Sequence, residues 1–142
     1  MNGVVVLHAS CVAFDGRGVL ILGPAGAGKS ALALQLMALG AALVADDRTA
    51  VAPTADGARL AARAPPGLPP LIEARGIGLL RAVPVPEAIL ALVVDLGAAE
   101  AARLPPRRVW HGCGIAVECI HGPATPHFPA AIRQYIRHGR DA

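Results

Sequence analysis

The sequence predicts an α/β protein in which a mixed, strand-rich sheet surrounds one helix that follows a glycine-rich loop. The first observation is the segment GPAGAGKS at 23–30, which lies between the apolar run GVLILG and the leucine- and alanine-rich run SALALQLMALG. The second is that short apolar runs typical of strands outnumber helical ones. The third is a length of 142 residues with 54% apolar composition, which favours a single domain over residues 1–142.

Each element follows from the local pattern of apolar residues. A helix of about ten residues is expected after GPAGAGKS, closed by Gly40, and a second, amphipathic helix in FPAAIRQYIRHGRDA. The segment APPGLPPL is expected to be a proline-rich loop without helix or sheet. Because strands and helices do not alternate regularly, a mixed sheet is favoured over regular parallel winding. The strands are expected near 4–7, 12–14, 19–22, 42–45, 49–53, 58–62, 89–95 and 115–120.

The segment GPAGAGKS contains Lys29, the only lysine in a chain with twelve arginines. A chain that uses arginine everywhere else retains lysine here, which indicates that the position requires it. The spacing is that of a P-loop, in which backbone amides wrap phosphates, the ammonium reaches the β and γ oxygens, and the hydroxyl takes a Mg²⁺ ligand position. We therefore expect a nucleoside triphosphate to bind at Gly23, Pro24, Ala25, Gly26, Ala27, Gly28, Lys29 and Ser30.

Two places offer an aspartate at the end of a second strand, where P-loop enzymes commonly hold Mg²⁺. Asp46 and Asp47 follow the run ALVA, and Asp95 follows ILALVV. Asp95 has the longer apolar run before it, but an aspartate that opens a turn is common at strand ends. The adjacent pair starts the loop directly after the P-loop helix and its return strand. It is therefore favoured for metal charge balance and for proton removal from an alcohol.

Composition argues against several other classes of function. The net charge is +3, and the arginines are scattered without the basic run or aromatic interleaving of a nucleic-acid surface. The start MNGVVVLHAS lacks a basic region before a long apolar run, and no stretch approaches the ~18 apolar residues of a membrane span. We expect a soluble, cytoplasmic protein that binds neither nucleic acid nor membrane.

The three cysteines, Cys11, Cys113 and Cys119, are expected to be reduced thiols, because their number is odd and CxxC spacing is absent. The segment HGCGIAVECIH places two histidines and two cysteines in a mirrored pattern that is compatible with zinc. If the segment is one strand, these side chains share a face but spread over about 30 Å, too far apart for one ion. Strand packing is therefore favoured over metal binding.

Two further motifs accompany the P-loop. The segment LVADDR places Asp46 sixteen residues beyond Ser30, and LIEARGIGLL carries the pattern E-x-R-G-x-G from Glu73. From about His8 to about Glu118, the chain resembles the catalytic domain of HPr kinase/phosphorylase. The resemblance implies an HPr kinase or PEP-carboxykinase-like fold. It also implies a bacterial enzyme that uses ATP and Mg²⁺ to phosphorylate a serine of HPr, a phosphotransferase-system carrier, and in many members to remove that phosphate by phosphorolysis.

The resemblance assigns catalytic roles to four residues. Asp47 matches the proton acceptor for the attacking serine, with Asp46 as its neighbour. Lys29 matches the phosphate contact. His8, twenty-one residues before Lys29, matches the active-site histidine, although Ala9 replaces the usual glycine after it. A protonated or hydrogen-bonded His8 would keep the two aspartate charges compatible.

The resemblance also assigns a metal site and an assembly. Ser30 matches one Mg²⁺ ligand, and Glu73 matches another in the family's signature loop. Members are hexamers, so a homo-oligomer is expected. The family's N-terminal domain is expected to be absent, because His8 is near the start, and the C-terminal helical region that helps to bind HPr is shortened to one helix.

The expected activity is that of an ATP- and Mg²⁺-dependent serine kinase acting on an HPr-like carrier. A module that senses ATP without phosphoryl transfer, and a small-molecule kinase, remain open as alternatives. In bifunctional members, an arginine eight residues before a strand glutamate assists phosphorolysis. Glu118 takes the glutamate's place here, and the arginine position falls near Trp110 or His111. Neither has a fixed positive charge, so phosphorolysis is expected to be slow or absent, with any rate that depends on His111 rising at lower pH.

Overall fold

The computed structural model describes residues 3–122 and 125–142. Its elements, in chain order, are β1 (Val5–Leu7), β2 (Ala9–Phe14), β3 (Arg17–Leu22), α1 (Lys29–Ala38), β4 (Ala42–Ala45), β5 (Thr49–Pro53), β6 (Leu60–Arg63), β7 (Leu71–Ala74), β8 (Gly78–Arg81), β9 (Ala88–Ala99), β10 (Arg108–Gly112), β11 (Ile115–Gly122) and α2 (Phe128–His138). The main sheet has the order β1-β5-β6-β9-β3-β2-β4, and β11 joins it beside β9 and carries β10. The strands β7 and β8 pair only with each other.

The main sheet is mixed, as the sequence predicts. β9 runs parallel to both β3 and β11, whereas the pairs of β2 with β3 and of β2 with β4 are antiparallel. In the β3–β9 register, Leu22 at the end of β3 lies opposite Asp95, and β9 continues beyond this point to Ala99. The loop from β3 to α1 starts at this point, which places the glycine-rich segment there.

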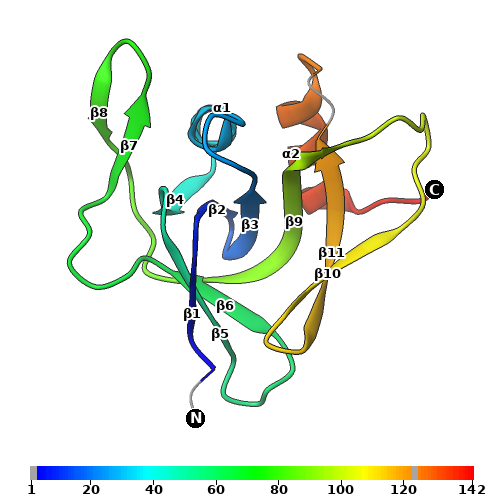
Figure 1. Ribbon diagram of the computed structural model, residues 1–142, viewed down its shortest axis with the longest axis horizontal. Coiled ribbons are helices and arrows are strands. Elements are labelled where there is room, and N and C mark those ends of the chain that lie inside the picture. Colours follow the sequence, from blue (N-terminus) through cyan, green and yellow to red (C-terminus); the bar gives the residue numbers. More distant parts are fainter. Residues whose placement is uncertain (1–2, 123–124) are drawn as a thin grey trace.

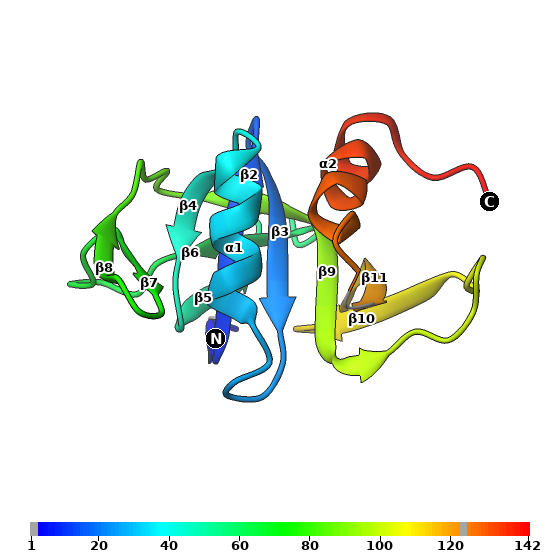
Figure 2. The same cartoon turned by 90° about the horizontal axis from the view of Figure 1, so that it is seen from above.

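The two helices lie on one side of the main sheet. Figure 2 shows α1 lying along β2 and β3, with α2 beside it, and the two helices contact each other. The β7–β8 hairpin stands at one side of the molecule, where β7 contacts α1 (Figure 1). Within the described ranges, neither helix has the length and apolarity required to cross a membrane.

The central strands are buried on both faces, which explains their nearly continuous apolar sequences. On the helix side, Val12 and Ile21 pack with Leu36 of α1 and Ile132 of α2. On the opposite face, Leu20 belongs to a second cluster, which also includes residues of β6, β9 and β11. Buried apolar clusters therefore cover both faces of the central strands, and the loop before α1 starts at the end of one of them, β3.

Most of the predicted elements are confirmed. β4 and β5 have the predicted bounds, and α1 ends just before Gly40, whose φ of 108° lies in the left-handed region that suits a helix terminator. The strand predicted at 89–95 is longer, since β9 continues to Ala99. The amphipathic C-terminal helix is α2.

The signature segment is a hairpin and not a loop, so the expected loop position of Glu73 is wrong. Glu73 lies on β7, and Arg75–Ile77 form the turn into β8. These two strands pair only with each other, and Leu79 on β8 is largely exposed. Strands are predicted from alternating apolar and polar residues, and this alternation is weak in a hairpin that buries little of its surface. The sequence pattern therefore does not predict the hairpin.

The segment HGCGIAVECIH is also a hairpin, so the single strand assumed for it is wrong. β10 ends at Gly112, and Cys113 and Gly114 form the turn with φ of 51° and 77°. Two left-handed residues are what a two-residue hairpin turn requires, but cysteine is seldom found there. In the part of the chain that is described, no group of three or more His, Cys, Asp or Glu side chains is arranged to hold a metal ion.

The three cysteines are free, and they differ in their environments. Burial raises the pKa of Cys11 to about 12 and raises that of Cys119 as well, whereas Cys113 is exposed. A raised pKa leaves less of the reactive thiolate. We expect iodoacetamide at about pH 8 to modify Cys113 alone in the folded protein, and all three thiols after denaturation. Mass spectrometry of digested protein tests this, and rapid native labelling of Cys11 would contradict the packing described here.

Candidate active site

The segment 23–28 forms a tight loop between β3 and α1. Gly26 and Gly28 have φ of 82° and 98°, a conformation that L residues with a side chain rarely adopt. A Cβ on Gly23 would lie 3.1 Å from Ala27 Cβ and 3.2 Å from Leu96 Cβ, so the loop packs closely against the end of β9. A glycine-rich loop that leads into the N-terminus of a helix is an arrangement that suits phosphate.

Lys29 is the first residue of α1 and is only 8% exposed. Its Nζ donates to the carbonyl oxygens of Gly23 at 2.7 Å and Pro24 at 3.2 Å. Among the described residues, the ion pairs include none with Lys29. An ammonium held only by neutral carbonyls retains its full charge for an incoming anion.

Asp46 connects three parts of the site. Its Oδ1 accepts hydrogen bonds from the hydroxyls of Ser10 at 2.7 Å and Ser30 at 2.8 Å. Its Oδ2 accepts from the backbone N–H of Glu73 at 3.2 Å. One half-buried carboxylate therefore joins β2, the first turn of α1 and β7. It orients the Ser30 hydroxyl and fixes the hairpin that carries Glu73.

Asp47 is directed away from Asp46 by its backbone. Its φ of 70° is uncommon for a residue with a side chain, although aspartate tolerates it better than most. Backbone bonds hold this conformation: Asp47 O accepts from Ala9 N at 3.1 Å, and Asp47 N donates to Ser10 Oγ at 3.4 Å. The Asp47 side chain is 66% exposed, and its Oδ1 lies 3.6 Å from His8 Nδ1. The backbone of Asp47 is thus held in place, and its carboxylate is accessible.

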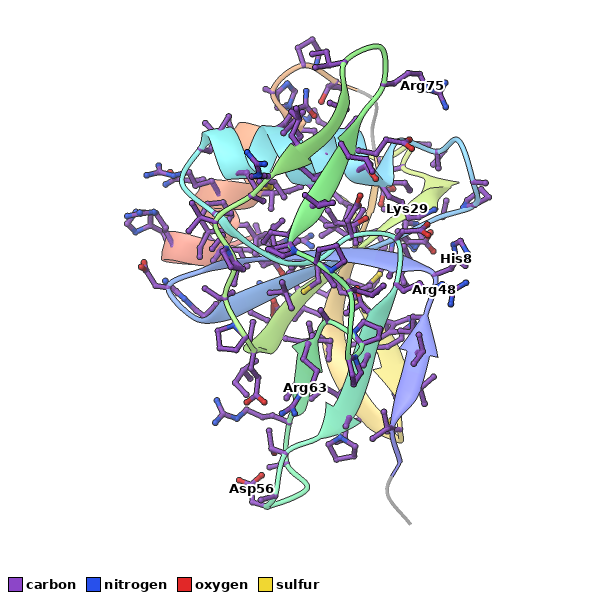
Figure 3. All side chains as sticks on the ribbon, turned by 90° about the vertical axis from the view of Figure 1, so that its left-hand side faces the viewer. His8, Lys29, Arg48, Asp56, Arg63 and Arg75 are labelled. Atoms are coloured by element: carbon purple, nitrogen blue, oxygen red, sulfur yellow. The ribbon has the colours of Figure 1, made fainter. Side chains whose placement is uncertain are left out.

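Lys29, Ser30, Asp47, His8 and Glu73 line one open cleft of about 650 Å³. Figure 3 shows Lys29 and His8 near each other at one edge of the molecule, with Arg75 at the hairpin turn beyond Lys29. The fold thus brings together most of the predicted site from four separate segments. The lining residues are His8, Ala25, Gly26, Gly28, Lys29, Ser30, Ala31, Leu34, Asp47, Glu73, Ala74, Arg75 and Ile77.

Asp46, Asp95 and His111 are not among the residues that line this cleft. Asp95 Oδ1 accepts from Gly97 N at 2.8 Å, so its carboxylate is engaged in a local turn. His111 lies opposite Ala116 in the β10–β11 pair, whereas His121 lies opposite Asp95 at the edge that carries the P-loop. Five residues of strand separate these levels, which corresponds to about 16 Å. His111 therefore does not reach the phosphate loop, and a phosphorolysis rate that depends on it is no longer expected.

Sequence analysis gave no role to Ser10. It is fully buried, donates to Asp46 and accepts from the amide of Asp47, so it fixes the positions of both aspartates. The serine in the otherwise apolar strand ASCVAF could have indicated such a role, because a buried hydroxyl needs a hydrogen-bond partner. Arg75 lies in the quoted signature motif, but its place in the cleft followed only from the hairpin.

Comparison with known proteins places this geometry in a family. The model of the family described as HPr Serine kinase C-terminal domain matches residues 1–85. The HPr kinase/phosphorylase of Limosilactobacillus reuteri is 46% identical over 74 residues, 52% of this chain and 23% of that protein. The one from Bordetella pertussis is 49% identical over 65 residues, 46% of this chain and 21% of that protein.

A solved structure extends the similarity to nearly the whole fold. The Hpr(Ser) kinase/phosphatase from Coxiella burnetii matches with a TM-score of 0.76 and 26% identity, over 94% of each chain. The aligned segments nevertheless span less than a quarter of the two relatives above. The family model covers more than half of the 142 residues, and the matching fold has the same mixed sheet. This chain therefore belongs to the HPr serine kinase C-terminal domain family.

Proposed function

We propose that this chain is an ATP- and Mg²⁺-dependent kinase that phosphorylates a serine of an HPr-like phosphocarrier. The observation that carries the proposal is the joint placement of Lys29, Ser30 and Asp47 around one cleft. An ammonium that is bonded to neutral carbonyls, an oriented hydroxyl and an accessible carboxylate are groups that suit phosphoryl transfer to an alcohol. Family membership and the similar kinases support the same reaction.

In this proposal, the segment 23–30 binds the triphosphate. The amides at the start of α1 and the Lys29 ammonium would hold the β and γ phosphates. To reach them, Nζ would exchange its bonds to Gly23 O and Pro24 O for phosphate oxygens, which are stronger acceptors because they are charged. Lys29 lines the cleft, so rotation of its side chain would be sufficient for this exchange.

The oxygen donors of the cleft fit Mg²⁺. Ser30 supplies a hydroxyl that Asp46 holds in place, and Glu73 supplies an exposed carboxylate on the same cleft. Oxygen ligands of this kind, together with substrate phosphates and water, are what Mg²⁺ prefers. The bound ion would neutralise charge that develops on the transferring phosphoryl group. Ser30 and Glu73 are therefore the proposed metal ligands.

Asp47 would act on the attacking alcohol. Its carboxylate would accept a hydrogen bond from the carrier's serine hydroxyl and take the proton as the new O–P bond forms. The bond from the γ phosphorus to the β–γ bridging oxygen breaks, and ADP leaves. His8, 3.6 Å from Asp47 Oδ1, would orient that carboxylate and balance its charge when protonated. Asp46 would act on Ser30 and not on the alcohol.

Replacing Glu73 with glutamine is expected to raise the Mg²⁺ concentration required for half-maximal activity. Glutamine keeps the size and the backbone bond to Asp46 but removes the charge that the metal needs. The shift should be on the order of tenfold, the scale of losing a supporting group at a metal site. Mg²⁺ titrations of the kinase rate measure it. The matched control is Glu87→Gln, because the Glu87 carboxylate pairs with Arg63 outside the cleft. If both variants give the same Mg²⁺ titration, Glu73 is not a metal ligand.

Phosphorolysis is proposed to be slow or absent. The bifunctional members have an arginine at this position, and neither Trp110 nor His111 has the permanently charged guanidinium of an arginine. The strand register also places His111 far from the phosphate loop. Pyrophosphate release from serine-phosphorylated carrier with excess phosphate should remain far below the forward rate at every pH between about 6 and 8.5. His111→Ala should leave it unchanged. A rate comparable with the forward reaction would contradict the proposal.

Carrier-dependent ADP formation separates the proposed kinase from its alternatives. A serine kinase forms ADP when Mg²⁺, ATP and an HPr-like carrier are all present, and stops when the carrier's serine is replaced with alanine. A module that only senses ATP binds it without carrier-dependent turnover. A small-molecule kinase forms ADP with a metabolite extract and not with the carrier. Equal turnover with the alanine carrier would overturn the proposed substrate.

Resemblance to the family also leads us to propose that 1–142 acts as one kinase domain in a cytoplasmic homo-oligomer, six subunits by analogy. The proposed substrate is a phosphocarrier protein, so we propose no role for membrane or nucleic acid in the reaction. Sedimentation velocity of the purified chain measures the assembly. A monomer at the concentrations that support catalysis would contradict the hexamer but leave the chemistry of the cleft unaffected.

A further inference from the structure

Buried polar side chains are rare in this chain and gather beside the candidate active site. Among the residues that the structure describes, only Ser10, Lys29 and Thr49 are buried polar or charged residues, and the two hydroxyl residues have no exposed surface at all. Lys29 lines the cleft, whereas Ser10 on β2 and Thr49 on β5 do not. A buried hydroxyl needs a hydrogen-bond partner, so the partners of these two residues indicate what they hold in place.

The two hydroxyls attach the turn between β4 and β5 to the start of β2. The Thr49 hydroxyl donates to Ala9 O at 2.8 Å, and Ala9 N donates to Asp47 O at 3.1 Å, so the turn uses both polar backbone groups of Ala9. The Ser10 hydroxyl donates to Asp46 Oδ1 at 2.7 Å and accepts from Asp47 N at 3.4 Å. We call these four hydrogen bonds together the hydroxyl bracket.

The left-handed backbone of Asp47 is not explained by strand pairing. Among the described residues, three that are not glycine have φ in this region: Asp15, Asp47 and Cys113. Asp15 lies between the paired strands β2 and β3, and Cys113 lies between β10 and β11, where tight hairpin turns require such values. β4 and β5, on either side of Asp47, pair with other strands and not with each other. The hydroxyl bracket, and not a hairpin, therefore holds the strained backbone of Asp47.

The same bracket determines where His8 lies relative to Asp47. His8 directly precedes Ala9, and its Nδ1 lies 3.6 Å from Asp47 Oδ1. The two side chains are 69% and 66% exposed, so little packing of their own holds them. Their relative position depends on the two backbone segments that carry them, and the hydroxyl bracket joins these segments.

We propose that Ser10 and Thr49 are positioning residues for phosphoryl transfer, which hold the Asp47 carboxylate and the His8 imidazole at the place where the attacking alcohol binds. The inference rests on the proposed function, because it takes Asp47 as the group that accepts the serine proton. Catalysis by such a group depends steeply on its placement, and a displacement of about 1 Å costs on the order of 100-fold in rate. Loss of the Thr49 hydroxyl should therefore slow the transfer step without weakening ATP binding.

Thr49→Val is the sharper test, because among the described residues the Thr49 hydroxyl bonds only to Ala9 O. Valine has nearly the shape of threonine but lacks the hydroxyl. At saturating Mg²⁺-ATP and carrier, the transfer rate should fall about tenfold or more, while the ATP affinity stays within about twofold of the parent. Thr49→Ser, which restores a hydroxyl, should recover most of the rate. Thr54→Val removes a hydroxyl at the turn between β5 and β6 and is the control, with the parental rate expected.

Melting temperatures separate positioning from stability. If Thr49 only fills space, Thr49→Ser should lower both the melting temperature and the rate, because it removes a buried methyl group. If Thr49 positions Asp47, the rate should follow the hydroxyl and be kept by Thr49→Ser but lost by Thr49→Val, whichever variant is less stable. In the Asp47→Asn background, Thr49→Val should cost almost no further rate, because the proton acceptor that it positions is already gone.

Ser10→Ala supplies a second variant, which decides the outcome if Thr49→Val does not fold. Its transfer rate should also fall about tenfold or more, and this loss should again vanish in the Asp47→Asn background. Parental activity of the variant tested, equal losses in Thr49→Val and Thr49→Ser, or a loss that persists without Asp47 would overturn the inference. A parent chain that phosphorylates no carrier would instead overturn the proposed function, and this inference with it.

Discussion

Lys29→Ala is expected to lose more than about 100-fold in affinity for ATP and to show no measurable transfer. The ammonium would make two or more charge-assisted hydrogen bonds to phosphate, and each is worth roughly 1.5–3 kcal/mol. No other lysine exists to replace it, and the charged arginine on the cleft, Arg75, lies at the hairpin turn. Calorimetric titration with Mg²⁺-ATP measures the affinity, and carrier phosphorylation measures the transfer.

A structural loss must be separated from the loss of charge. Removing Lys29 also leaves the carbonyls of Gly23 and Pro24 without a donor, so the loop itself could change. Lys29→Arg keeps a cation and donors, and it should retain weak ATP binding because the guanidinium has a different shape. Melting temperatures of both variants report whether the fold persists. Undiminished phosphorylation by Lys29→Ala would remove the P-loop interpretation.

The elements that line the phosphate loop were predictable because their signals are local. The motif GPAGAGKS fixes a strand, a turn and a helix, and ALVADD fixes the next strand and the acids that follow it. The order of strands in space was not predictable, because it depends on pairing between distant segments. Only the structure reveals that β9 lies beside β3, with Asp95 of β9 opposite Leu22 at the start of the loop.

The separate roles of Asp46 and Asp47 could be recognised only from the structure. Sequence places Asp46 and Asp47 together and offers no means of distinguishing them. In the fold, the left-handed backbone at Asp47 turns that side chain to the cleft, while Asp46 is enclosed by Ser10 and Ser30. Similarly, the hairpin that carries Glu73 could not be recognised from apolar periodicity, because one β7–β8 pair buries too little surface to show it.

Asp47→Asn is expected to bind ATP and Mg²⁺ almost normally and to lose about 100-fold or more in transfer rate. Asparagine keeps the shape and tolerates the left-handed backbone, but it cannot accept the serine proton. The contrast is Asp46→Asn, which disturbs the Ser30 hydroxyl and the Glu73 amide and should therefore weaken Mg²⁺-ATP binding as well. Single-turnover rates at saturating ATP, with affinities measured in parallel, separate the two effects.

Asp95→Asn provides the control for the other strand. Its carboxylate is engaged by the Gly97 amide, so this substitution should leave the transfer rate within a few-fold of the parent. If Asp47→Asn is fully active while Asp95→Asn is inactive, the proton acceptor lies at the end of β9 and the assignment made here is wrong. Loss of ATP binding by Asp47→Asn would instead give Asp47 a role in nucleotide binding.

The most direct test of the central claim is the location of the label after incubation with γ-labelled ATP, Mg²⁺ and an HPr-like carrier. We expect label on a single serine of the carrier, at a rate that depends on Asp47, with none retained on the kinase chain. Peptide mapping of the carrier identifies the residue, and the corresponding serine-to-alanine carrier should remain unlabelled. A chain that binds ATP tightly but leaves every carrier serine unlabelled would contradict the account.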